Sequence, residues 1–436
     1  MPDVWYTLSA DTQDALFTLL LSLPALLTGL VVLRSYAPGP LVRALLWRFR
    51  WPNLMFVLLI AVSVGMGIGL IAQERGLRHG TAAAADKFDM IVAAPGSEIT
   101  MMLASIFLQP SNVPLLDGAM YDAVANHEQV ALAAPLGFGD SYGEAPVVGT
   151  IADFVQHLTE GEIEGRMWQA PFEAIAGAYV SLEIGDQFTP AHGMSGNVQP
   201  GAHGDAYTVV ARMPATGSPW DRAILVPIEG VWAVHGLANG HAPDKPTQLG
   251  PPFDARFFPG TPAIVVKANE LWATYALRAE FTRDGESMAF FPGAVLARLY
   301  AIMGDLRQAM TLMTLVTQSL VATSVLVGLF ILTRLFRRQM ALLRALGAPG
   351  RFILSVVWSY AAALLLAGSA LGMLFGLGAA QVLSRVVTAR TDILVEPHLG
   401  WSEVHLLAGF VSVTLILSLL PAWAVLRRPV VEGLRS

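Results

Sequence analysis

The sequence contains no cysteine and only three lysines, Lys87, Lys245 and Lys267. Without cysteine, no part of the chain rests on disulfide bonds, so each domain needs an ordinary hydrophobic core. No G-x-x-x-x-G-K-[ST] pattern occurs either, so the lysine-containing loop that cradles ATP phosphates is missing. The chain therefore encodes no ATP-binding site of this kind, and any ATP and Mg²⁺ would belong to another polypeptide.

Charged residues are also scarce. They make up 14% of the 436 residues, whereas 54% are hydrophobic. A chain of this length and composition is typical of a membrane protein. No nucleic-acid partner is expected for it.

Five segments are long and apolar enough to cross a hydrocarbon core of about 30 Å, which takes roughly 20 helical residues. The predicted spans are 15–33, 54–72, 307–334 (with a stalk before it), 353–383 and 406–426. Their central parts contain no Asp, Glu, Lys or Arg, which argues against an ion-coupled carrier.

Arginines fix the expected orientation, because cytoplasmic loops carry an excess of basic residues. They gather in a linker at 34–53, in a loop at 335–352 and in a tail at 427–436, which we therefore place in the cytoplasm. Residues 1–14 carry acidic but no basic side chains and are expected outside, as is the loop 384–405. A signal peptide is the competing interpretation of 15–33, but that segment lacks a basic start and a small-residue cleavage site.

Residues 73–306 differ from the rest in composition. Acidic side chains outnumber basic ones there, and Gly and Pro are frequent. By alternation of the spans, this segment is an extracytoplasmic domain, and its length suffices for a core of its own. Short β-prone runs at 90–92, 146–148, 207–213, 223–226 and 263–266 alternate with helical stretches at 99–107, 119–125 and 269–281. The predicted fold class is a membrane bundle of about five helices plus an α+β domain.

The loop 335–352 has the pattern of a short amphipathic helix. Leu342, Leu343 and Leu346 share roughly one helical face, and Gly347 supplies a stop. The polar side of this helix carries Arg337, Arg338 and Arg344. An apolar contact rimmed by arginines suits a groove on an acidic protein. The alternative is that the arginines bind lipid phosphates and only enforce topology.

The order of parts and two cytoplasmic motifs resemble the FtsX/MacB-type permeases, also called type VII ABC transporters. Residues 337–348, RRQMALLRALGA, are similar to the family's RRxxAxLRALGA loop, and Gln339 stands where many relatives have glutamate. The end of the chain is similar to the family's PAxxA…PxExLR tail through Pro421, Ala422, Trp423, Ala424, Pro429, Glu432, Leu434 and Arg435. The span 15–33 departs from the family's pattern of four helices.

A second similarity lies in the external domain. The segments DMIVAAPGS from Asp89, GDS from Gly139, VGT from Val148, GDQF from Gly185, AHG from Ala191 and TGSPWDR from Thr216 resemble a bacterial branch of the same family. The resemblance implies a domain like the MacB periplasmic core. It also implies a cytoplasmic ABC ATPase as partner and a dimer with a second permease copy or a paralogue.

Small residues recur within the spans. Gly368, Gly372 and Gly376 repeat every four residues, a spacing that lets two helices approach closely. The sequence leaves open whether the close partner lies in the same chain or across a dimer. The family resemblance favours the dimer.

Chemistry in this chain is not expected. His192 and His203 are weak candidates for metal ligands, because their spacing is irregular and no HxH or HExxH pattern occurs. Loop histidines are the simpler interpretation. No G-x-S-x-G elbow is present, so we predict no enzyme.

The sequence thus predicts a permease subunit in the bacterial inner membrane that works by mechanotransmission. A separate ATPase would drive conformational change in the external domain, for export or extraction of an amphipathic substrate such as a lipoprotein, lipid, peptide or drug. The rival hypothesis is an FtsX-like signalling module, which activates an extracytoplasmic or lipoprotein partner such as a cell-wall hydrolase without transport. An exposed apolar patch remote from the membrane would favour the rival.

Overall fold

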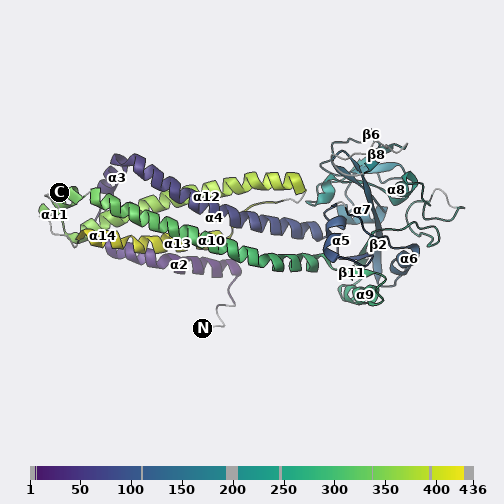
Figure 1. Ribbon diagram of the computed structural model, residues 1–436, viewed down its shortest axis with the longest axis horizontal. Coiled ribbons are helices and arrows are strands. Elements are labelled where there is room, and N and C mark those ends of the chain that lie inside the picture. The colour runs from purple at the N-terminus through teal and green to yellow at the C-terminus, as the bar shows by residue number, and fades with distance from the viewer. Residues whose placement is uncertain are drawn as a thin grey trace. The chain divides into compact units, whose positions relative to one another are not determined.

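The computed structural model describes residues 5, 7–109, 111–192, 205–244, 248–335, 337–391 and 395–426. The chain divides into two compact units. The helical unit comprises Met1–Gly76, Asp305–Arg385 and Glu396–Ser436, and the sheet unit comprises Leu77–Gly304 and Val386–Val395. Figure 1 shows the elements of each unit.

The helical unit is built from long apolar helices. Four stretches could cross a membrane by length and composition, namely Ala10–Leu33, Arg50–Ala85, Gly350–Ala389 and Trp401–Trp423. They correspond to α2 (Ala10–Leu33), α4 (Arg50–Ala85), most of α12 (Gly350–Thr391), and α13 (Trp401–Leu417) with α14 (Leu419–Leu426). The short helix α3 (Gly39–Arg48) lies in the predicted basic linker.

The third predicted span lies in α10 (Pro292–Leu335), which is continuous through the expected stalk. Only Leu315–Gly328 counts as an apolar helical stretch there, and several side chains between 302 and 335 lie outside the described set. Five spans therefore stay a prediction.

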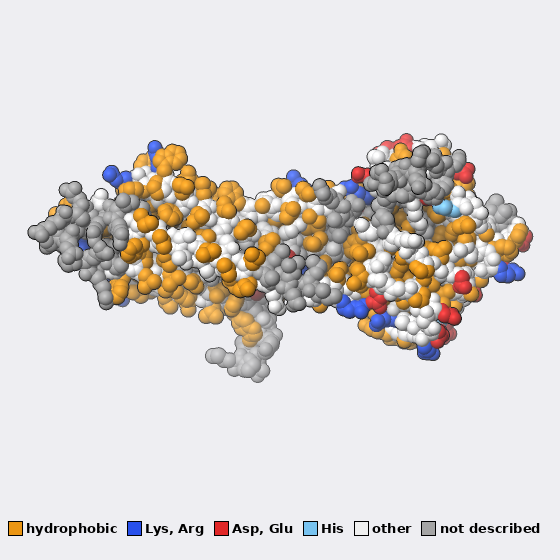
Figure 2. Space-filling view, viewed as in Figure 1, with side chains coloured by type: hydrophobic (Ala, Val, Ile, Leu, Met, Phe, Trp, Pro, Cys, Tyr) orange, Lys and Arg blue, Asp and Glu red, His pale blue; other side chains and the backbone are white. Residues whose placement is uncertain are grey.

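Large apolar side chains cover the surface of the helical unit (Figure 2). Leu30, Met55 and Leu374, for example, are 71%, 74% and 66% exposed. A patch of this extent would be unfavourable in water, but hydrocarbon tails solvate it as well as a protein core would. The surface thus fits a membrane.

Two helices are longer than the spans predicted for them. The predicted external loop 384–405 is helical up to Thr391, because α12 continues through RVVTART, where polar residues end a membrane span but no Gly or Pro ends the helix. Likewise α4 continues past residue 72 to Ala85 through an alanine-rich stretch. The segment predicted as a loop is therefore helical at 384–391, and again from Trp401, where α13 begins.

The sheet unit contains an eleven-stranded sheet within the described residues. Its main path runs β11 (Met288–Phe290), β1 (Met90–Ala93), β10 (Ala263–Ala268), β2 (Val130–Tyr142), β3 (Ala145–Thr150), β9 (Ile224–Pro227), β5 (Glu173–Ala176), β8 (Tyr207–Arg212) and β4 (Glu164–Gly165). Off this path, β6 (Gln187–Phe188) pairs with β8, and β7 (Ala191–His192) pairs with β2. All pairs are antiparallel except β3 with β9 and β5 with β8.

Helices α5 (Glu98–Ser105), α6 (Gly118–Ala125), α7 (Ala152–Thr159), α8 (Ile228–Val234) and α9 (Leu271–Arg283) complete the sheet unit. All five predicted strand regions and all three predicted helical stretches are confirmed within a few residues. The core includes the aromatic contacts of Phe88, Phe154 and Trp220, whose ring centroids lie 5.3–5.9 Å apart. This ordinary core replaces the disulfides that the sequence lacks.

An ion pair joins the ends of β4 and β5. The guanidinium of Arg166 donates through Nη1 to Glu173 Oε2 at 2.8 Å, and Gln169 N donates to the same oxygen at 2.6 Å. Arg166 and this backbone donor together hold the pKa of Glu173 at about 2, well below its ordinary 4.5, although burial opposes the shift. Both groups therefore favour the charged carboxylate.

This pair makes the sheet unit acid-sensitive. A carboxyl group whose folded pKa is lowered stabilises the fold above its unfolded pKa and loses that contribution as the pH falls from 4.5 towards about 2. We expect Glu173→Gln to remove about 1 kcal/mol of this acid-dependent stability, because half of Arg166 is in solvent. Tryptophan-fluorescence melting of the full chain at pH 5, 4 and 3 measures it.

The matched control is Glu183→Gln, since Glu183 is 78% exposed and lies 3.7 Å from Arg212. It should leave the pH dependence of melting nearly unchanged. If the melting temperatures of the wild type and Glu173→Gln changed with pH in parallel, Glu173 would not be the source of the acid sensitivity.

Candidate functional site

The amphipathic helix predicted in the loop 335–352 exists as α11 (Arg337–Ala345). Its sequence is rich in Leu, Ala, Arg, Gln and Met, the residues that lose least on entering a helix. The helix ends where predicted, because Gly347 has a positive φ of 94°, a conformation that favours glycine.

A Schellman cap closes this helix. The N–H of Ala348 donates to the carbonyl of Leu343 at 2.9 Å, and the N–H of Gly347 donates to that of Arg344 at 3.1 Å. These bonds satisfy carbonyls that the last turn would otherwise leave without donors. The cap holds the end of α11 in one conformation before Pro349 and α12.

The two faces of α11 differ in burial. Met340 and Ala341 are buried at 3% and 6% exposure, and Leu343 packs in part against the same core of the helical unit. Leu342 and Leu346 are 47% and 80% exposed. The predicted three-leucine face is therefore split, because Leu343 sits at its edge and turns towards the core.

Gln339 lies on the exposed face with Leu342 and Leu346, since positions three and seven residues on share one side of a helix. Arg344 is half-buried. The side chains of Arg337 and Arg338 lie outside the described set, as does the tail with Pro429, Glu432, Leu434 and Arg435. In α14, Ala422 is buried and Trp423 is half-exposed.

The three repeated glycines of α12 contact α4 of the same chain. A Cβ on Gly368 would lie 2.7 Å from side-chain atoms of Ile60, and one on Gly372 would lie 2.8 Å from the carbonyl oxygen of Ala61. A Cβ on Gly376 would lie 2.6 Å from the carbonyl oxygen of Gly65. The close approach that the spacing predicts is therefore made within the chain.

Polar contacts lie on either side of this glycine stretch. Towards the start of α12, the hydroxyl of Tyr360 donates to Asn53 of α4. Towards its end, Ser384 Oγ donates to Gln73 Oε1 at 2.9 Å. In the stretch between these two polar contacts, α4 and α12 pack side by side and form a fixed pair.

Sequence reasoning missed a buried ion pair in the helical unit. Arg75 Nη2 donates to Glu403 Oε2 at 2.8 Å, and Glu403 is fully buried. The same carboxylate accepts from the N–H of Gly400 at 3.1 Å, which caps α13. The sequence gives only a weak signal for this pair. Glu403 stands three positions into α13, which is the usual place for a carboxylate that caps a helix.

α2 packs on α13, although nearly the whole chain separates them. Trp401 Nε1 donates to Asp11 Oδ1 at 3.0 Å, and Ala25 N donates to Ser412 Oγ at 3.2 Å. α2 contains Pro24, and a neighbouring helix can satisfy backbone groups that a proline disturbs within a membrane. The additional predicted helix is thus an integral part of the helical unit.

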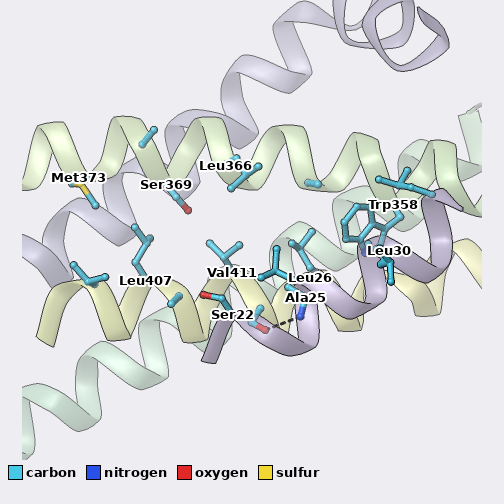
Figure 3. A pocket seen from close by; sticks show the side chains of 18 of the residues that line it. Ser22, Ala25, Leu26, Leu30, Trp358, Leu366, Ser369, Met373, Leu407 and Val411 are labelled. Carbon is cyan, nitrogen blue, oxygen red and sulfur yellow. Dashed lines mark hydrogen bonds between the residues drawn. The ribbon is translucent and has the colours of Figure 1, made fainter. Parts of the chain in front are cut away.

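A groove of about 1120 Å³ lies between α2, α12 and α13 (Figure 3). Its lining is almost entirely apolar, with Leu26, Leu366 and Leu407 among the side chains drawn. Two buried polar atoms in the wall, Trp358 Nε1 and Ser369 Oγ, have no hydrogen-bond partner in the described part of the chain. Arg34 lies at one end.

The side chains of the two histidines named as weak metal candidates are not described by the structure. His203 and the side chain of His192 lie outside the described residues. Among the side chains that the structure describes, no group of three or more His, Asp or Glu could hold a metal ion.

The TGSPWDR segment builds a turn. Both carboxylate oxygens of the buried Asp221 accept backbone N–H donors, from Thr216 at 2.7 Å and from Gly217 at 2.8 Å. Thr216 Oγ1 donates to the same carboxylate at 2.6 Å. These bonds explain why the segment needs an aspartate, and its role is structural.

Comparison with known proteins bears on the C-terminal part. Residues 309–430 match a protein-family model described as FtsX-like permease C-terminal, a region that includes α11, the repeated glycines and α13. This match confirms the predicted family resemblance there. No curated protein matches the chain.

Among solved structures, the chain is similar to the extracellular domain of the noncanonic ABC-type transporter YknZ from Gram-positive bacteria. The sequence identity is 10% and the TM-score is 0.27, and the similarity covers 46% of this chain and 98% of that chain. At this score the similarity carries no conclusion about the sheet unit.

Proposed function

Because residues 309–430 form an FtsX-like permease C-terminal domain, we propose that this chain is the membrane-spanning subunit of an ABC transporter. A separate cytoplasmic ATPase supplies ATP hydrolysis, with ATP and Mg²⁺ bound on that subunit. The chain itself carries out no catalysis. It resides in the bacterial inner membrane, with the sheet unit on the extracytoplasmic side.

The observation that carries the proposal is the exposed edge of α11. Leu342 and Leu346 are 47% and 80% exposed in the loop with the family's basic motif, and a Schellman cap fixes the helix end. Two ordered leucines on a rigid helix supply the apolar contact that a docking interface needs at its centre. Buried Met340 and Ala341 anchor the opposite side of α11.

Helix continuity supports mechanotransmission. α10 is one uninterrupted helix of 44 residues from Pro292 to Leu335, so it is about 66 Å long at 1.5 Å per residue. Its residues belong to the sheet unit at the start and to the helical unit at the end. A displacement at the C-terminal end of α10 would therefore be passed along one continuous helix.

We further propose an amphipathic substrate, such as a lipoprotein, lipid, peptide or drug, and a MacB-like core for the sheet unit. The centres of the predicted spans contain no acidic or basic residues. This supports a substrate route outside the helices rather than through a polar channel. A dimer with a second copy or a paralogue completes the proposed transporter. The proposed dimer does not rest on the glycines of α12, because these glycines pack against α4 of the same chain.

The test replaces Leu342 and Leu346 together by aspartate. Burying two carboxylates in an apolar contact is unfavourable, and we expect co-purification of the ATPase and its stimulated hydrolysis to fall by more than about tenfold. The measurement is the amount of ATPase recovered with the tagged permease, together with its rate of ATP hydrolysis.

The matched control is Leu237→Asp with Leu271→Asp, two leucines of the sheet unit that are 51% and 82% exposed. It introduces the same charges and should leave docking intact. Unchanged recovery of the ATPase with the α11 variant, at normal membrane insertion, would refute the coupling role.

One observation fits the rival function, activation of an extracytoplasmic partner. In α9, Leu271, Trp272 and Tyr275 are 82%, 65% and 66% exposed, an unusual set on an acidic domain. A partner-activating role would use such a surface. Export remains our proposal, because the confirmed family match lies in the permease domain.

A further inference from the structure

The apolar groove between α2, α12 and α13 has the dimensions of a lipid site. Its volume of about 1120 Å³ lies just above the usual range for small-molecule pockets, roughly 300–1,000 Å³. The lining extends along α2 from Ser22 to Arg34, twelve residues or about 18 Å of helix. One leaflet of a bilayer has a hydrocarbon depth of about 15 Å, half of the whole core.

The groove is a built feature rather than a gap between loosely packed helices. At one point the Trp358 indole lies directly over Gly29, where a Cβ would be 2.8 Å from Cη2. At another, Ala25 N donates to Ser412 Oγ of α13. These two contacts hold α2 against both neighbours, and the space beside them is left without protein side chains (Figure 3).

One end of the groove is positive. Arg34 follows the last residue of α2, is exposed, and makes no ion pair with any described residue. It belongs to the basic segment 34–53, which the distribution of arginines places on the cytoplasmic side. A phosphate group at that end of the groove would pair with it.

The wall near this end also contains a buried polar group. Trp358 is 8% exposed, and its indole N–H has no acceptor in the described part of the chain. A buried N–H without an acceptor is unfavourable by about 1–3 kcal/mol. Trp358 contacts Gly29, five residues or about 7.5 Å of helix from Arg34.

We propose that this groove holds one anionic phospholipid of the cytoplasmic leaflet, with its phosphate on Arg34 and its acyl chains between α2, α12 and α13. The lipid is a structural component that fixes α2 in the bundle. The proposal is independent of the transported substrate and of ATPase docking.

Native mass spectrometry of the full chain, purified in mild detergent, tests the proposal. We expect one anionic phospholipid to remain bound per chain. After delipidation, phosphatidylglycerol should rebind and raise the melting temperature more than phosphatidylcholine does. Arg34→Gln should lower the retention of phosphatidylglycerol by about fivefold, and that of phosphatidylcholine by less, because the choline cation offsets the phosphate charge. Arg43→Gln, at an exposed arginine of the same basic segment, is the control and should retain the lipid.

A second pair of variants tests the place of binding. Ala408→Trp fills the groove from α13 and should displace the lipid. Gly409→Trp, at the next residue of α13, is the control. A Cβ at Gly409 meets no atom within 4 Å, and we expect this variant to leave the lipid bound. The proposal would be overturned if the bound lipids matched the bulk lipid composition and Arg34→Gln did not change it. It would also be overturned if Ala408→Trp left lipid retention intact. A transported amphipath or a partner helix found in the groove would likewise overturn it.

Discussion

Replacing Gly376 by leucine is expected to force α4 and α12 apart and to lower the free energy of unfolding of the helical unit by about 3 kcal/mol. The reason is that the first added carbon would already lie 2.6 Å from the carbonyl oxygen of Gly65, and backbone cannot move aside as a side chain can. Lipid tails are as apolar as leucine, so the larger side chain gains no hydrophobic stabilisation in return.

The measurement is unfolding of the purified chain in mixed micelles, followed by tryptophan fluorescence. Gly378→Leu, on the same helix, is the matched control, because a Cβ there meets no atom within 4 Å. It should leave the unfolding free energy within about 0.5 kcal/mol of the wild type. If the two variants are equally stable, the close contact of α4 with α12 is not the one described.

Arg75→Ala is the second change for which we expect a large effect. Glu403 is fully buried, and removal of Arg75 leaves its carboxylate without a cation. Breaking a buried ion pair from one side destabilises by about 3–5 kcal/mol, and we expect the lower figure because Arg75 is partly exposed. Glu403→Ala should be milder, since the remaining guanidinium can be hydrated.

Two further variants separate the pair from a simple loss of charge. Arg75→Met with Glu403→Leu removes both charges and keeps the volume, so its stability should return towards that of the wild type. Arg256→Ala breaks an exposed pair with Asp254 and should lower the unfolding free energy by less than about 1 kcal/mol. A double variant as unstable as Arg75→Ala would show that packing, not charge, matters at this site.

Local patterns predicted much of this protein. The runs at 90–92 and 263–266 became β1 and β10 because their Val and Ile residues suit a buried sheet. The longest strand, β2, was not among the predicted runs, because VALAAPLGFGDSY contains the Ala, Gly and Pro that are depleted in strands. Its place between β10 and β3 depends on pairing with residues far along the chain.

The stop of helix α11 near Gly347 was predictable, since Gly347 is a local stop signal. The role of its leucines was only partly predictable. Hydrophobic periodicity identifies an apolar side of a helix, but it does not distinguish a contact with the protein's own core from a contact with a partner. Leu343 illustrates this: it packs in part on the core, whereas Leu342 stays exposed.

The contacts that no local pattern could give are those between distant helices. Arg75 with Glu403 and Asp11 with Trp401 are separated by more than 300 residues. No local sequence pattern links the two members of either pair. Only the assembled bundle brings the partners together.

The hydrogen bond from Ala25 N to Ser412 Oγ has a consequence for how the protein is made. These residues are 387 positions apart, so at 5–20 residues per second the ribosome needs about 20 to 80 s to supply Ser412 after Ala25. During that time α2 is in the membrane without α13, its closest companion. A chain cut short before α13 would leave the side of α2 that carries Ala25 without its partner in α13, while its contact with Trp358 of α12 could still form.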